Sequence, residues 1–401
     1  MEEAREPDNQ QVLRVLEALK QASKDIKNKP SLLKTDCNSS AINVLLELEN
    51  EPGNILSDDP NLSNLSNHLT SLRILVDKLR RSQGHSLQSF LRRRVSNHEI
   101  SKVAGTIENE IQAWIDRVIV EKLVTTLQVS SVEEDENVKL LTQFENRVSQ
   151  GFNRDLQNLI LKSKVFSRLE SVLCNPKFSK RIREQSALAI DALVRFNKDV
   201  FVDQVLMSPT IRVLISMASN FSIQVLCSLI KLIKSPLVDE IEANGEIPKL
   251  LSFLNAEDWS LRIAAMDCIL DIAYFGRKEA IEAMLEEGLI QKLVELQMSE
   301  LGGDLIEMDR FSENETSGVC VGGVEMESKG RKEKKEMRFL ENHPFASCVA
   351  RFAVHLDVGE GLRQSERRAF KQEILKKVKE ACVSDAEAAT IVAEVLWGSS
   401  P

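Results

Sequence analysis

Residues 245–298 carry a pattern of glycine, proline and apolar residues that limits the folds open to this chain. Gly245 is followed by an apolar helical segment, a polar turn, an Ala-rich apolar segment and a third amphipathic segment, after which Gly288 begins the pattern again. Gly245 and Gly288 are 43 residues apart, within the roughly 40–47 residues typical of stacked helical repeats. Such a unit cannot bury its apolar face alone, so one clear copy predicts neighbouring copies and a solenoid.

The same pattern recurs earlier in the chain with less regular spacing. Residues 193–206 align with 272–285 at an offset of 79 residues. Residues 165–173 align with 246–254 after a two-residue gap, and residue 210 opens a shorter copy. Repeats are therefore predicted to start near residues 165, 210, 247 and 290.

The sequence on either side of the repeats predicts further helical regions. Leu-rich segments of helical spacing come first, whereas residues 300–343 are rich in Gly, Glu and Lys and have too little apolar area to order themselves. Ser384 and Glu387 predict a capping box for the last helix. Four regions are predicted: an N-terminal helical bundle at 1–150, helical repeats at 151–299, a flexible low-complexity insertion at 300–343, and a helical cap at 344–401 that hides the last apolar face.

The composition argues against several kinds of partner and location. Aromatic residues make up only 5% of the chain, which favours an aliphatic helical core over a sheet. The formal net charge of −9 disfavours nucleic acid, whose phosphates require a basic face. No segment approaches the ~20 apolar residues of a spanning helix, and the acidic N-terminus is unlike a secretory signal. The seven cysteines form no Cys-x-x-Cys pair, which predicts buried thiols in the cytoplasm, the nucleus or both.

Two segments of the sharpest repeat resemble a known family. GEIPKLLSFL and IAAMDCILDIA resemble the armadillo consensus, in which Gly-x-Ile-Pro-x-Leu-x-x-Leu-Leu precedes an Ala-rich third helix. The likeness is specific at 245–298 and fair at 165–244. It implies an all-α chain, with an N-terminal helical bundle followed by an armadillo-like right-handed α-solenoid.

The N-terminal region carries a second resemblance. Its Leu-rich helices and the segment AWIDRVIV resemble the helical region that precedes the U-box in plant U-box/armadillo proteins. The Ile-Pro-x-x-Phe-x-Cys-Pro-Ile signature, with which a U-box docks its ubiquitin-conjugating enzyme, is absent from this sequence. The resemblance therefore implies an armadillo-type interaction protein without ligase activity of its own.

The armadillo likeness implies a partner-binding groove lined by third helices. Readers of basic import signals carry a Trp and, four residues later, an Asn on successive third helices, and none of the three tryptophans here is followed in this way. The equivalent groove positions are Asp267 and Asp271 in the sharpest repeat, and Leu188 and Ala192 in the first copy. The two acids predict a groove that prefers a basic or amide-rich ligand, and the alternative is an ordinary solvated helix face.

A basic cluster lies at the internal turn of the first copy. It consists of Lys177, Lys180, Arg181 and Arg183. It is either a site for an acidic partner or a solvated loop, and charge runs more often belong to the second class. The basic run at 329–338 is interrupted by Glu333 and Glu336, which weakens its interpretation as an import signal.

The sequence contains no recognisable catalytic or cofactor motif. The five histidines lack metal-ligand spacing, and no GxSxG, P-loop or GxGxxG motif occurs. We therefore expect no enzymatic activity, cofactor, metal or small-molecule substrate. The leading prediction is a non-enzymatic scaffold that binds an extended peptide or helix of a protein partner in the armadillo groove. The alternatives are an accessory or substrate-recognition factor in ubiquitin ligation and an importin-like transport adaptor.

Overall fold

A computed structural model describes residues 16–18, 20–21, 23–25, 27, 63–81, 87–128, 133–302 and 343–397. Every regular element within these ranges is a helix, so the predicted all-α class is confirmed. The chain divides into two compact units, one of residues 1–128 with 153–165 and the other of residues 129–152 with 166–401. Each unit is described by itself. The predicted flexible insertion lies outside the described residues between positions 303 and 342.

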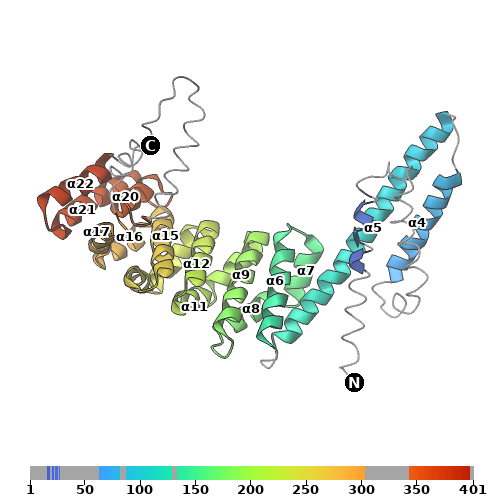
Figure 1. The fold of residues 1–401 in the computed structure, drawn as a ribbon, viewed down its shortest axis with the longest axis horizontal. Helices are drawn as coiled ribbons and strands as arrows, with labels where there is room; N and C mark the ends of the chain where they lie inside the picture. The colour runs from blue at the N-terminus through green and yellow to red at the C-terminus, as the bar shows by residue number, and fades with distance from the viewer. Residues whose placement is uncertain are drawn as a thin grey trace. The chain divides into compact units, whose positions relative to one another are not determined.

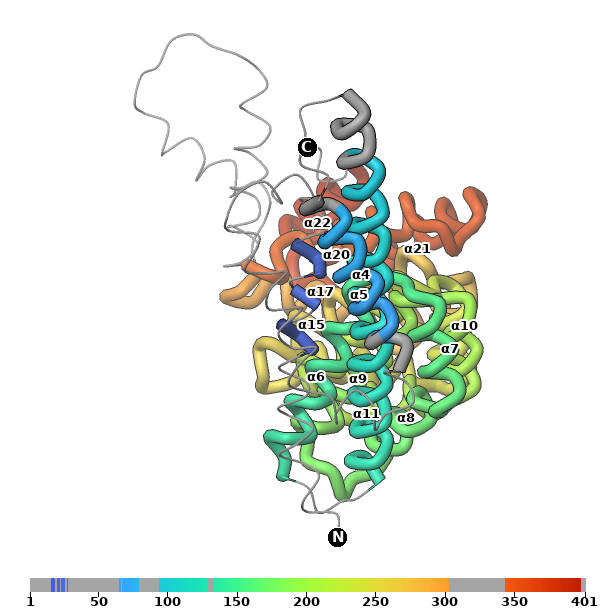
Figure 2. Tube along the Cα trace, turned by 90° about the vertical axis from the view of Figure 1, so that its right-hand side faces the viewer, coloured from blue at the N-terminus to red at the C-terminus, as the bar shows by residue number. Residues whose placement is uncertain are grey.

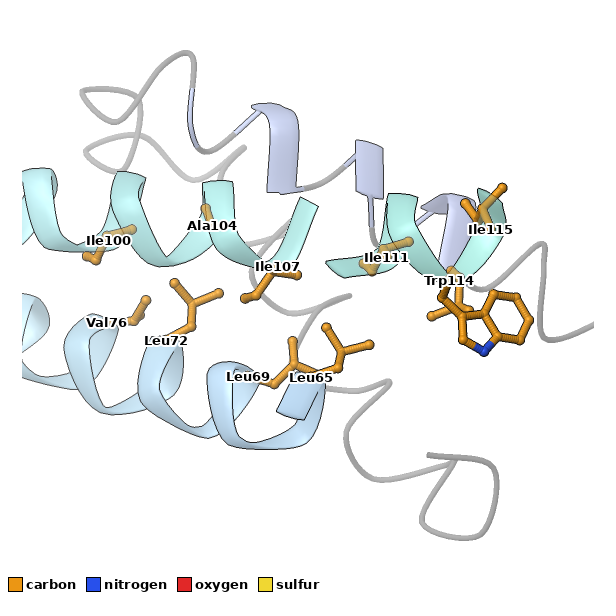
Figure 3. Close-up of a cluster of buried hydrophobic side chains, with 11 residues drawn as sticks. Leu65, Leu69, Leu72, Val76, Ile100, Ala104, Ile107, Ile111, Trp114 and Ile115 are labelled. Carbon is orange, nitrogen blue, oxygen red and sulfur yellow. The ribbon is translucent and has the colours of Figure 1, made fainter. Parts of the chain in front are cut away.

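The first unit is built on a pair of helices, α4 (Ser63–Arg81) and α5 (Leu87–Thr126), with α7 (Arg154–Lys162) packed on α5. Apolar residues spaced by three and four positions face each other across the pair, as helical periodicity requires. Figure 3 shows this core, which includes Leu65, Leu69, Leu72 and Val76 of α4 and Ile100, Ala104, Ile107 and Ile111 of α5. α5 begins at Leu87, and its contribution to this core begins at Ile100.

The second unit contains the remaining helices. They are α6 (Glu134–Ser149), α8 (Val165–Cys174), α9 (Lys180–Phe196), α10 (Lys198–Leu206), α11 (Thr210–Met217), α12 (Asn220–Ile233), α13 (Ser235–Ala243), α14 (Ile247–Ser252) with the short 3₁₀ helix η2 (Phe253–Asn255), α15 (Trp259–Phe275), α16 (Lys278–Glu286), α17 (Leu289–Gln297), α20 (Cys348–Val358), α21 (Gln364–Ala381) and α22 (Asp385–Trp397). A long helix follows each of α8, α11, α14 and α17 along the chain. We call α9, α12, α15 and α20 the third helices.

The predicted repeat starts are confirmed. α8, α11, α14 and α17 begin at Val165, Thr210, Ile247 and Leu289, each within one residue of its predicted position. Gly245 and Gly288 precede two of these helices with φ angles of 68° and 77°. Only glycine adopts this left-handed conformation without strain, which explains its place at the start of the sharpest repeats.

Successive third helices pack side by side. α6 packs on α9, α9 on α12, α12 on α15 and α15 on α20, as Figure 1 shows. Figure 2 shows these helices after a turn of 90°, with α10 at the right-hand side of the view. Small residues such as Ala264 and Ala265 are buried in α15 and let its neighbours approach closely. The described residues of the second unit thus form an armadillo-like α-solenoid.

α6 and α7 are grouped differently from the regions inferred from the sequence. α6 packs along α9 and belongs to the second unit, although residues 134–149 fall within the predicted bundle at 1–150. α7 falls within the predicted repeat region at 151–299 and belongs to the first unit. Both helices are amphipathic, and an apolar face alone does not specify which neighbour covers it.

The C-terminal helices close the described chain. The backbone N–H of Phe345 donates to the Leu301 carbonyl oxygen at 3.3 Å, so the two sides of the insertion meet beside α17 and α20. The predicted cap residue Ser384 accepts a hydrogen bond from the Glu387 backbone N–H at 3.2 Å. α22 nevertheless buries the carboxylate of Glu394, which accepts from Gln297 and Ser347, and exposes Leu396 and Trp397.

Candidate protein-binding face

The solvent side of three consecutive third helices forms the candidate site, which we call the third-helix face. The side chains on each helix recur at intervals of three or four residues, so they lie along one side of that helix. They are Leu188, Asp191 and Arg195 on α9, Phe221, Gln224, Ser228 and Lys231 on α12, and Trp259, Ile263, Asp267 and Asp271 on α15. Contacts between neighbouring helices join the three sets into one surface.

A hydrogen-bonded triangle joins α9 to α12. Arg195 Nε donates to Asp191 Oδ2 at 2.8 Å, and Arg195 Nη2 donates to Ser228 Oγ at 2.6 Å. The Ser228 hydroxyl in turn donates to Asp191 Oδ1. The Asp191 side chain is only 10% exposed whereas that of Arg195 is 58% exposed. The acid therefore lies beneath the surface and the guanidinium lies above it.

An ion pair joins α12 to α15 in the same manner. Lys231 Nζ lies 3.2 Å from Asp271 Oδ2, and the two side chains are 60% and 12% exposed. Burial raises the pKa of Asp271, and Lys231 opposes this shift. Burial alone would lower the pKa of Lys231, but the adjacent Asp271 carboxylate outweighs it and the pKa is raised. At neutral pH the pair is therefore an ammonium exposed above a buried carboxylate.

The charged side chains continue toward α20. The Asp267 side chain reaches solvent. Partial desolvation by neighbouring atoms raises the pKa of its carboxyl group, and the charges of Arg351, Lys231 and His355 oppose this shift. The ring of His355 on α20 meets that of Tyr274 on α15 edge-on, with centroids 6.4 Å apart. We call Asp191, Arg195, Ser228, Lys231, Asp267 and Asp271 the polar row.

Large apolar side chains lie on the N-terminal part of the same face. Phe221, Trp259 and Ile263 are 55%, 49% and 37% exposed, and we call them the apolar patch. The Arg262 guanidinium lies over the Trp259 ring, 4.9 Å from its centroid, which holds the indole in place by cation–π attraction. Neighbouring exposed apolar side chains of this size are typical of binding surfaces.

The structure distributes the four predicted groove positions between surface and interior. Asp267 is exposed and Leu188 is half-buried, whereas Asp271 and Ala192 are buried. Four residues of α-helix turn through about 400°, so a side chain four positions further on points about 40° to one side. In these helices that rotation directs Asp271 and Ala192 toward the neighbouring helix. The buried Asp271 charge is offset by Lys231 and is not presented to a ligand.

Several contributors to the face were not identified from the sequence, among them Phe221, Lys231 and Arg195. Phe221 and Lys231 lie on α12, whose copy is shorter, so the alignment of the first and third copies passed over it. Arg195 lies three residues beyond the predicted position Ala192. A search for exposed positions at helical spacing along 220–233 would have found Phe221, Gln224 and Lys231.

The four residues of the predicted basic cluster have different surroundings. Arg181 Nη1 donates to Asp135 Oδ1 of α6 at 2.7 Å, and Arg183 Nε donates to the Leu173 carbonyl oxygen at 2.8 Å. Lys177 and Lys180 are exposed. Two of the four cations therefore already bind groups of the protein itself.

The described residues contain no group of three or more His, Cys, Asp or Glu side chains arranged to hold a metal ion. Cys174, Cys227, Cys268, Cys348 and Cys382 are free thiols. No single described helix is long and apolar enough to cross a membrane, although α10 and α11 meet those criteria jointly as a bent pair.

Comparisons with known proteins assign no family to the chain. No protein-family model and no curated protein matches it. Among solved structures, the designed armadillo repeat protein YIII(Dq)4CqI is 15% identical, with 68% of this chain and 98% of that chain covered and a TM-score of 0.40. The designed armadillo repeat protein YIII(Dq.V1)4CPAF in complex with peptide (KR)4 is 17% identical, with 68% and 98% covered and a TM-score of 0.38. Kap121p bound to Pho4p is 11% identical, with 94% of this chain and 32% of that chain covered and a TM-score of 0.42. Similarity at this level transfers no residue or ligand to this chain.

Proposed function

We propose that this protein is a non-enzymatic scaffold that binds an extended or helical segment of another protein along the third-helix face. The apolar patch beside the polar row is the observation that carries this proposal. Protein interfaces concentrate their binding energy in a few aromatic anchors surrounded by polar side chains. Phe221 and Trp259 supply such anchors, and the polar row supplies the surround.

The cross-helix contacts favour binding without a large rearrangement. Arg195 is held by two hydrogen bonds, Lys231 by an ion pair and Trp259 by the Arg262 guanidinium. Side chains already held in place lose less conformational entropy when a ligand arrives. A shallow surface can therefore reach useful affinity with few anchors.

Proximity labelling in the native cell tests the proposal, using the full chain with Phe221→Ser and Trp259→Ser. Met207→Ser is the matched control, because Met207 is a strongly exposed apolar residue outside the third-helix face. We expect the double variant to lose labelled proteins that the wild type and the control both retain. Identical labelled sets for all three chains would refute the third-helix face as the binding surface.

The alternatives inferred from resemblance remain separate proposals. A role as an accessory factor in ubiquitin ligation rests on the resemblance of the N-terminal region, and an autoubiquitination assay with this chain alone is expected to be blank. An importin-like role would need an Asn four residues after Trp259, where Ile263 stands. We further propose the cytoplasm or nucleus as the location, which cell fractionation tests.

A further inference from the structure

We propose that the partner segment is acidic, with carboxylates that pair with Arg195 and Lys231 and a neighbouring apolar side chain that packs on the apolar patch. This rests on the proposed function and names the chemistry of its ligand. It also reverses the sequence-based prediction of a basic ligand.

The acids and the cations of the polar row lie at different depths below the surface. In both ion pairs of the polar row the acid is buried and the cation is exposed, with side-chain exposures of 10% against 58% for Asp191 and Arg195 and 12% against 60% for Asp271 and Lys231. Each pair is therefore a dipole whose positive end faces solvent. A charged group of a ligand that approaches α9 and α12 comes closer to the exposed cations than to the acids buried beneath them. Because the Coulomb energy falls with distance, the cations determine which ligand charge is attracted.

A basic ligand would have to compete with Arg195 and Lys231 for the buried acids. A basic side chain of a ligand could reach Asp191 or Asp271 only by displacing Arg195 or Lys231 from pairs that are already made. Asp267 is the exposed acid of the row, and the charges of Arg351, Lys231 and His355 act on its carboxyl group. A basic ligand thus finds one partly offset carboxylate, whereas an acidic ligand finds two cations whose side chains are more than half exposed.

The distance between Phe221 and Lys231 limits the spacing of the ligand residues that contact them. Lys231 follows Phe221 by ten residues of α12, which is about 15 Å along the helix axis. An extended segment covers that distance in about four or five residues, and a helical one in about ten. The ligand is therefore a segment with a large apolar residue and an acidic residue at one of these separations.

Three synthetic peptides test the chemistry directly. They share one apolar framework of Phe and Leu, lack Trp, and carry Glu, Gln or Lys at every polar position. Binding to the full chain is measured by anisotropy of a labelled peptide and by the change in Trp259 emission, in a Trp397→Phe background that removes the exposed tryptophan of α22. We expect the Glu peptide to bind about tenfold more tightly than the Lys peptide at physiological salt, with a smaller ratio at high salt.

Paired substitutions connect that preference to the polar row. Asp191→Asn with Arg195→Gln, and Asp271→Asn with Lys231→Gln, each remove an exposed cation together with its buried acid, so that no buried charge is left alone. The matched control is Lys278→Gln with Glu282→Gln, an exposed pair on α16 whose charged atoms lie 3.1 Å apart. The preference for Glu should disappear in the two polar-row variants and persist in the control.

The outcomes separate the two proposals. Equal binding of all three peptides that still requires Trp259 would overturn the acidic ligand and leave the proposed function standing. Tighter binding of the Lys peptide would overturn it in favour of the basic ligand. No Trp259-dependent binding by any peptide would also overturn it, and the labelling experiment would then decide the proposed function by itself.

Discussion

Replacing Lys231 with Met removes the cation that neutralises the buried Asp271 carboxylate, and it should destabilise the second unit by about 2 kcal/mol at neutral pH. At a separation of 3.2 Å, Coulomb's law gives about 5 kcal/mol for an effective dielectric constant of 20 and about 1 kcal/mol in bulk water. Because the Lys231 side chain is 60% exposed, solvent screening moves the expected value toward the lower figure.

The pH dependence of this loss has a definite sign. Burial already raises the pKa of Asp271 above the ordinary value of 3.8, and removal of Lys231 raises it further. A carboxyl group with a raised pKa in the folded state contributes stability at low pH that is lost as the pH rises through that pKa. Where the pH is low enough to protonate Asp271, Lys231 has no charge to neutralise. The difference between wild type and variant should therefore be largest at pH 7.5 and smaller at pH 5.

Urea unfolding followed by circular dichroism at 222 nm measures both effects. The control is Lys278→Met, which breaks an exposed pair with Glu282 and should leave the unfolding midpoint unchanged at both pH values. Adding Asp271→Leu to Lys231→Met should recover most of the lost stability, since it removes the buried charge. Our reasoning fails if Lys231→Met is as mild as the control, or if its loss grows toward pH 5.

Three further predictions concern the repeat turns, the helix caps and the thiols. Gly288→Ala should lower stability by about 1 kcal/mol, because the φ of 77° at Gly288 strains an L-residue. No atom lies within 4 Å of the added Cβ, so a steric clash does not contribute. Gly105→Ala inside α5 should instead raise stability by up to about 1 kcal/mol, and thermal melts measure both effects. Ser219→Ala removes the cap that accepts from the Ser222 N–H at 3.1 Å and should cost about 1 kcal/mol, with faster hydrogen exchange in the first turn of α12. Burial raises the pKa of the Cys348 thiol to about 12, so peptide-resolved iodoacetamide labelling at pH 8 should modify it only after unfolding in urea.

The repeat phase could be predicted because local chemistry determines it. A glycine with positive φ lies between two helices at Gly245 and again at Gly288, and Pro248 stands in the first turn after Gly245, so these boundaries need no help from distant residues. The start of α6 has a local cause as well, because Glu134, Asp135 and Glu136 lie in its first turn, where acids favour a helix N-terminus.

The neighbours of a helix were harder to predict than its boundaries. The apolar side of α6 contains Leu140, Leu141, Phe144 and Val148, and this spacing predicts burial without saying what covers the face. α9 covers this apolar side of α6, and no residue of α6 identifies α9 as its neighbour. The grouping of α6 and α7 therefore depends on long-range packing.

The candidate site shows the same division between local and long-range information. Repeat alignment placed the groove positions on α15 and α9, where Asp267 is exposed and Leu188 is half-buried. It could not show that Asp271 is buried, because that depends on how closely α12 approaches α15. Lys231 pairs with Asp271 only across this interface, so the sign of the exposed charge is a property of the packed helices.

The buried position of Asp271 also decides which substitution separates binding from folding. Asp267→Lys together with Asp271→Lys would place a second cation beside Lys231. Because position 271 is largely shielded from solvent, the two like charges would repel strongly. Loss of binding by that double variant would then follow from unfolding as readily as from an altered surface. Asp267→Lys alone changes an exposed charge and leaves the Lys231–Asp271 pair intact. If the ligand is acidic, this single variant should bind the Glu peptide more tightly at an unchanged unfolding midpoint, and weaker binding would contradict the charge pattern argued from the polar row.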